Sequence, residues 1–188
     1  MFFFSLKFGN NLQKLREAGS ISFIDALSKI ALCAQDVDGK LNYEELTNQV
    51  IKDIITNVAK GSFLIFDKIS ILQSLGLPIQ NFVAFIRKIQ NIVAKNDCLL
   101  VTCNRSLSQV GMIFDENTND DPFSSFLSHN AILNIAVRPL TSGRSINVSG
   151  NITYLWNMLN QDAPLEYQFR VEEKDVKVFS LGTSSAVL

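Results

Sequence analysis

The chain has 188 residues, of which 47% are hydrophobic and 19% charged, and its formal net charge is −1. This length predicts one globular domain over residues 1–188. The near-neutral charge excludes the strongly basic character that is typical of nucleic-acid-binding domains. No apolar run approaches the roughly 20 residues of a membrane-spanning helix, so a cytoplasmic location is expected, with the nucleus as an alternative. The apolar excess predicts buried interfaces with other subunits.

The first two thirds of the chain alternate between strand-like and helix-like patterns. A weak strand pattern covers residues 21–24, and a helix-like pattern follows to Cys33. Apolar residues at helical spacing run from 46 to 58 and from 79 to 93, with Gly61 and Pro78 as boundary signals. Continuous apolar runs at 63–66 and 98–103 predict buried strands. Buried strands separated by amphipathic helices predict a parallel α/β sheet flanked by helices.

The last third has a different character. Residues 105–128 contain a polar, acidic stretch that is typical of a loop. Strand patterns then follow one another at 131–137, 152–156, 165–171 and 176–181, with a turn expected at 172–175. The sequence therefore predicts a mostly parallel sheet that ends in an antiparallel hairpin.

One carboxylate, Asp67, directly follows the strand predicted at 63–66. Nucleotide-hydrolysing α/β proteins place a magnesium-directed acid at this position. However, no phosphate loop of the G-x-x-x-x-G-K-[ST] type occurs, because the only Gly-Lys pair, Gly39-Lys40, is followed by Leu41. We therefore favour a structural role, in which Asp67 caps the next turn through Ser70 or a backbone amide.

Three arginines lie near predicted strand ends or in loops: Arg105, Arg138 and Arg144. Guanidinium groups in such places bind phosphates, and an arginine at a subunit interface can act on a neighbour's nucleotide. Together with Asp67 they form the predicted nucleotide or interface set. The alternative is that they are solvated surface side chains.

Residues 34–45 match most of an EF-hand calcium loop, with Asp36, Asp38, Asn42 and Glu45 at ligand positions. The first ligand position is Ala34, so the leading carboxylate is missing. We favour a solvated turn with a capping Asp before a helix. No other metal site is predicted: His129 is the only histidine, and the three cysteines lack metal spacing and are expected to be buried free thiols.

Two segments resemble the Elongator complex protein 6 family: FLIFDKISILQSLG at 63–76 and LEYQFRVEEKDVKVFSLGTSSAVL at 165–188. The resemblance implies a RecA-like fold that lacks a phosphate loop. The family's first strand-helix unit has no counterpart in this chain, so an N-terminally shortened domain is expected.

The same resemblance implies a non-catalytic subunit without a cofactor. The family assembles with Elongator subunits four and five into a hetero-hexameric ring. That ring docks on the catalytic subcomplex, binds tRNA and supports carboxymethyl-type modification of the wobble uridine. Two alternatives remain open, namely a calcium-binding module built on residues 34–45 and a degenerate stand-alone NTPase.

Overall fold

The computed structural model describes residues 11–26, 28, 42–103, 121–140, 145–157, 164–173 and 175–182. The chain divides into two compact units, which are described separately: Ser22–Phe126, and Met1–Ile21 together with Leu127–Leu188. The expectation of a single domain stays a prediction. None of the helices in the described ranges is long and apolar enough to cross a membrane.

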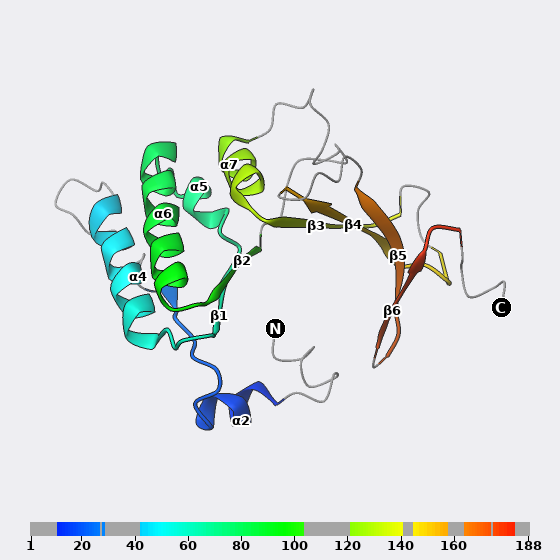
Figure 1. The fold of residues 1–188 in the computed structure, drawn as a ribbon, viewed down its shortest axis with the longest axis horizontal. Helices are drawn as coiled ribbons and strands as arrows, with labels where there is room; N and C mark the ends of the chain where they lie inside the picture. The colour runs from blue at the N-terminus through cyan, green and yellow to red at the C-terminus, as the bar shows by residue number, and fades with distance from the viewer. Residues whose placement is uncertain are drawn as a thin grey trace. The chain divides into compact units, whose positions relative to one another are not determined.

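The unit Ser22–Phe126 contains a parallel pair of strands and the helices around it (Figure 1). In chain order its elements are α4 (Tyr43–Asn57), β1 (Phe63–Asp67), α5 (Ile71–Ser74), α6 (Ile79–Lys95), β2 (Leu99–Cys103) and most of α7 (Pro122–Asn130). β1 and β2 pair in parallel, from Phe63 opposite Leu99 to Asp67 opposite Cys103. The helices predicted at 46–58 and 79–93, both predicted strands and their parallel arrangement are confirmed. The helix pattern predicted to run to Cys33 lies mostly outside the described residues and stays a prediction.

Local signals in the sequence account for the helix ends. Asn42 caps the start of α4, because its side-chain oxygen accepts the N–H of Glu45 at 3.1 Å. Pro78 directly precedes α6, as a proline at a helix start does. Gly61 was expected to end α4, but the helix already ends at Asn57. Gly61 lies in the turn before β1, where it has a φ of 72°.

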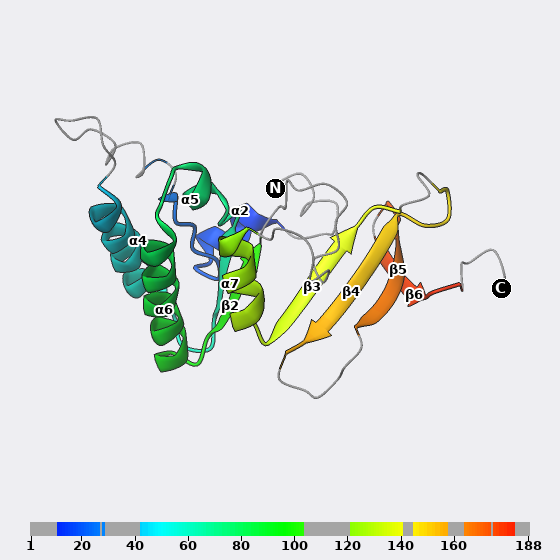
Figure 2. The same ribbon diagram turned by 90° about the horizontal axis from the view of Figure 1, so that it is seen from above.

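The core of this unit lies between the two long helices and one face of the strand pair. α4 and α6 lie side by side (Figure 2), and Phe85 of α6 packs edge-to-face on Phe66 of β1 at 6.0 Å. The other face of the pair leaves Phe63, Ile65 and Leu99 exposed. The prediction of buried strands therefore holds for only one face of the pair. The fully or nearly buried apolar residues of the unit are Leu46, Val50, Ile54, Ile69, Leu77, Phe82, Phe85, Ile86, Ile89 and Val93.

The helix α7 was not predicted; it begins at Pro122, where the predicted acidic loop ends. Asp121 caps it by accepting the N–H of Ser124 at 3.1 Å, and it also accepts the side-chain N–H of Gln73 in α5 at 2.6 Å. Phe123 and Phe126 pack against Phe82 of α6, with ring centroids 4.7 and 6.2 Å apart. Asp121 belongs to the acidic stretch that suggested a loop, and it caps the start of α7.

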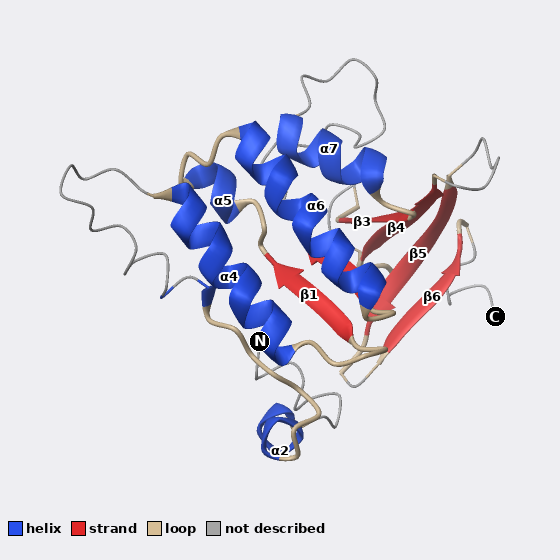
Figure 3. Cartoon of the chain, turned by 60° about the vertical axis from the view of Figure 1, so that its left-hand side comes forward, coloured by secondary structure: helices blue, strands red, loops and turns tan. Residues whose placement is uncertain are grey.

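The second unit contains an antiparallel sheet of four strands in the order β3-β4-β5-β6 (Figure 3). Its elements are α2 (Leu12–Glu17), the end of α7, β3 (Leu133–Arg138), β4 (Gly150–Trp156), β5 (Leu165–Val171) and β6 (Val176–Ser180). All four predicted strands are confirmed, but they form a larger antiparallel sheet than the expected hairpin. The strand expected at 21–24 is wrong, since these residues lie outside any helix or strand.

Asn157 connects the end of α7 to the end of β4. Its side-chain N–H groups donate to the carbonyls of Ser128 and Ala131, both at 2.7 Å, and its backbone N–H donates to Ile132 at 3.0 Å. The last carbonyls of a helix lack partners within the helix; here Asn157 supplies donors to two carbonyls, and Asn134 donates to that of Ser128 as well, at 3.0 Å. His129 lies exposed in the last turn of α7.

Candidate functional site

The carboxyl end of the parallel pair is the place where α/β proteins of this type carry out nucleotide chemistry. Asp67 ends β1 there, is exposed, and lies opposite Cys103. The next residue, Lys68, has a φ of 55°, and the turn is closed by backbone bonds from Ile69 to Cys103 at 3.3 Å and from Ile71 to Lys68 at 3.0 Å. The backbone itself therefore holds this turn.

The favoured structural role of Asp67 finds no support in these contacts. Within the described part of the chain its carboxylate accepts no hydrogen bond, and Ser70 makes no side-chain bond at the start of α5. In nucleotide-hydrolysing α/β proteins, an acid at this position acts through a magnesium ion that also binds the nucleotide's phosphates. The sequence, however, lacks the glycine-rich loop and lysine that would hold the phosphates of a nucleotide beside it.

Of the three predicted arginines, only Arg138 lies in the part of the chain that the structure describes. Arg138 ends β3 opposite Asn151 of β4. Its Nη2 is buried and has no hydrogen-bond partner, and the same holds for Oδ1 of Asn151. A buried nitrogen cannot reach the phosphate of a neighbouring subunit unless the side chain moves. Arg105 and Arg144 lie outside the described residues.

The structure describes only the end of segment 34–45, which resembles a calcium-binding loop. Asp36 and Asp38 lie outside the described residues, and Asn42 and Glu45 belong to the start of α4. The Asn42 side-chain oxygen, one of the required calcium ligands, already caps the helix. This observation favours the turn-and-cap interpretation, although the capping residue is Asn42 and not an aspartate. Across the described ranges, no group of three or more His, Cys, Asp or Glu residues could hold a metal ion.

Two shallow depressions lie on the α4–α6 side of the first unit. One, of about 300 Å³, is lined by Ile55, Val58, Ile92, Lys95 and Asn96. The other, of about 190 Å³, is lined by Glu44, Thr47, Asn81, Ala84, Phe85 and Lys88. Both are open to solvent and exclude Asp67 and Arg138, so neither extends the predicted site.

Two of the three cysteines, Cys98 and Cys103, lie in the described residues, and both are free thiols. The Sγ of Cys98 donates to the carbonyl of Ala59 at 3.1 Å and is half-buried. Cys103 is a free, exposed thiol, so the prediction of a buried thiol is wrong at this position. Cys33 lies outside the described residues.

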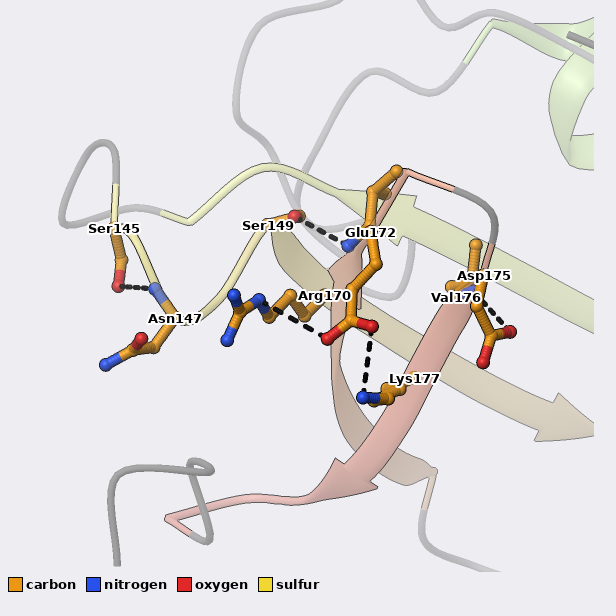
Figure 4. A network of polar contacts seen from close by, with 9 residues as sticks. Ser145, Asn147, Ser149, Arg170, Glu172, Asp175, Val176 and Lys177 are labelled. Atoms are coloured by element: carbon orange, nitrogen blue, oxygen red, sulfur yellow. Dashed lines mark hydrogen bonds and ion pairs between the residues drawn. The ribbon is translucent and has the colours of Figure 1, made fainter. Parts of the chain in front are cut away.

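A charged cluster at the turn between β5 and β6 was not predicted from the sequence (Figure 4). Glu172 lies 3.8 Å from Nε of Arg170 and 3.0 Å from Nζ of Lys177. Arg170 and Lys177 are cross-strand neighbours, so one carboxylate neutralises two cations on the same face. Partly exposed pairs of this kind contribute little to stability, and the cluster holds no group suited to catalysis.

The opposite face of this sheet was also not predicted as a site. It consists of every second residue of each strand, counted from Leu133 to Val137 in β3, from Gly150 to Trp156 in β4, from Leu165 to Val171 in β5 and from Val176 to Ser180 in β6. We call it the uncharged sheet face, because no charged side chain occupies any of these positions. Four aromatic residues lie on its two central strands: Tyr154, Trp156, Tyr167 and Phe169. The sequence pattern that could have revealed this face is the alternation of apolar and polar residues along these strands.

Comparisons with known proteins agree with the resemblance. The family model described as Elongation complex protein 6 matches residues 3–173. Relatives named Elongator complex protein 6 include those of Homo sapiens, at 25% identity, and of Rattus norvegicus and Mus musculus, both at 24%. Each alignment covers 97% of this chain and 75% of the relative.

Among solved structures, a KaiC-like protein from Pyrococcus horikoshii superposes with a TM-score of 0.52 at 15% identity. The match covers 93% of this chain and 68% of that one. At this identity the likeness shows the fold alone. It confirms the predicted RecA-like α/β class.

Proposed function

Because the chain belongs to the Elongation complex protein 6 family, we propose that it is a non-catalytic accessory subunit of the Elongator complex. The family match over residues 3–173 is the observation that carries this proposal. The missing phosphate loop supports the non-catalytic part, since Asp67 alone cannot hold a nucleotide's phosphates.

Its partners in this proposal are Elongator subunits four and five, in a hetero-hexameric ring that docks on the catalytic subcomplex. The low charge of the chain and its exposed apolar side chains support protein partners over direct binding of nucleic acid. tRNA would bind the assembled ring. The role of the ring would be to support carboxymethyl-type modification of the wobble uridine, in the cytoplasm or the nucleus.

Co-expression with subunits four and five tests the assembly. Size-exclusion chromatography with light scattering should show one species with the mass of two copies of each subunit. If this chain elutes separately while subunits four and five remain soluble, the proposed assembly is wrong. A tRNA-binding titration of the purified ring, with the single chain as control, then tests the second step.

The non-catalytic assignment has its own test in the ring. Asp67→Asn removes the negative charge of the candidate acid and keeps the side-chain volume nearly constant. We expect nucleotide hydrolysis by the ring to keep its wild-type rate, because no phosphate-binding group accompanies Asp67. A fall of tenfold or more, in a ring of unchanged mass, would show that Asp67 is a working acid.

A further inference from the structure

We propose that the uncharged sheet face of β3 to β6 is the surface through which this chain binds another subunit of its complex. The partner is a different folded protein that presents an uncharged, apolar layer of a helix or sheet. This inference rests on the proposed function, and it adds which surface of the chain makes the contact.

The two faces of the sheet differ in chemistry. No charged side chain occupies the uncharged sheet face. The opposite face carries Arg138, Glu166, Arg170 and Lys177, and at its centre Ala136 and Thr153 are already buried, at 4% and 7% exposure. An antiparallel sheet normally covers its apolar face with another layer, whereas here the apolar side chains of the uncharged sheet face stay exposed. The asymmetry therefore assigns the contact to the uncharged face.

The exposed apolar area of this face is large, and with its aromatic residues it approaches the area of a standard interface. Six aliphatic residues of this face are 41–62% exposed: Ile135, Val137, Leu165, Val171, Val176 and Val178. Together they expose on the order of 500 Å², which is at the upper end of the apolar patches that monomers leave uncovered. The partly exposed aromatic residues between them raise this toward the about 800 Å² that each partner contributes to a standard interface.

The centre of the face consists of aromatic side chains that pack against neighbouring residues. The Tyr154 and Tyr167 rings meet edge-on at 5.9 Å. The Phe169 ring lies over Gly150, where an added Cβ would come within 2.8 Å of it. Aromatic residues at the centre with aliphatic residues around them are the composition of protein interface cores.

The absence of cations from this face decides the class of partner. Nucleic acid and anionic membrane surfaces are bound mainly through Lys and Arg side chains, and the uncharged sheet face has none. An apolar protein layer needs no charge complement, and sheets pack on other layers at about 10 Å. A protein partner therefore fits this face best.

Two single substitutions test the proposal. Val137→Lys and Val178→Lys place a charge at accessible positions on β3 and β6, so the fold should tolerate them. Ile146→Lys is the matched control, because Ile146 is 92% exposed and lies outside the strands. We expect each variant on the face to bind subunits four and five at least about tenfold more weakly in a titration, while the control binds as the wild type does. Equal melting temperatures of the variants establish that the fold is kept.

Each other outcome has a definite meaning. If the wild type assembles and both face variants assemble equally well, the inference is wrong while the proposed function stands. If the wild type does not assemble, the proposed function itself fails. If the chain alone forms a dimer that Val137→Lys dissociates, a second copy covers the face and the stated partner is wrong. Hydrogen exchange gives a readout without variants: assembly should slow exchange in residues 133–138 and 176–180, and unchanged exchange there contradicts the proposal.

Discussion

Replacing Phe82 by alanine should strongly destabilise the unit Ser22–Phe126. Phe82 is only 1% exposed, so its whole side chain is removed from water on folding. Its ring contacts Phe123 at 4.7 Å and Phe126 at 6.2 Å, and these contacts fix α7 against α6. The substitution would remove the buried ring, both aromatic contacts and the packing around them.

The magnitude follows from these contacts. Truncation of a buried phenylalanine costs about 3–5 kcal/mol, and each aromatic pair contributes about 0.5–1.5 kcal/mol of that. With two pairs lost, we expect a fall of about 4 kcal/mol in the free energy of unfolding. For a urea m-value of about 2 kcal/mol/M, the midpoint would drop by roughly 2 M.

Urea denaturation should be followed with two probes. Circular dichroism at 222 nm reports mainly on α4 and α6, whereas fluorescence reports on Trp156, the only tryptophan, which lies in β4 of the other unit. The matched control is Phe23→Ala, because Phe23 is 70% exposed and lies outside any helix or strand. The control should change the free energy by less than about 0.5 kcal/mol. A loss below about 1 kcal/mol for Phe82→Ala would refute the packing argument.

Three further substitutions test local features by thermal or urea unfolding. Asn42→Ala should lower the free energy of unfolding by about 1 kcal/mol, because the α4 cap is lost. Asn42→Asp keeps a capping oxygen and should stay near the wild type, so an equal loss in both variants would contradict the capping role. Gly150→Ala should cost about 1–3 kcal/mol, since its Cβ would meet the backbone carbonyl of Arg138, and an unchanged midpoint would contradict that crowding. Asn157→Ala should cost about 1 kcal/mol, because the Ala131 carbonyl loses its side-chain donor while the Ser128 carbonyl still accepts from Asn134. Hydrogen exchange of residues 128–132 that stays at the wild-type rate would contradict the role.

Elements with a regular apolar pattern could be predicted from the sequence. The alternation in β5 placed it at Leu165–Val171, as the structure has it, and the apolar stripe of α6 located that helix. α7 was missed because its cap and first turn have the composition of a loop. The exposed face of β1 was missed because a continuous apolar run looks the same whether one or both faces of a strand are covered.

The site was less predictable than the fold. The sequence placed Asp67 correctly at the end of a strand, but only three-dimensional contacts show that no described residue binds its carboxylate. The buried Nη2 of Arg138 depends on how β3 packs, and no local pattern reports that. The uncharged sheet face depends on the register of four strands, because the same alternation in a slipped register would scatter its side chains over both faces.

The division of the chain into a continuous and a discontinuous unit has a consequence for its synthesis. The unit Ser22–Phe126 is one uninterrupted stretch, so it can complete its contacts soon after residue 126 leaves the ribosome. The other unit combines residues from both ends of the chain, and its sheet is finished only when β6 has been made. Until then the nascent chain carries an unfinished strand edge, which is a target for chaperones or for a partner that is already folded.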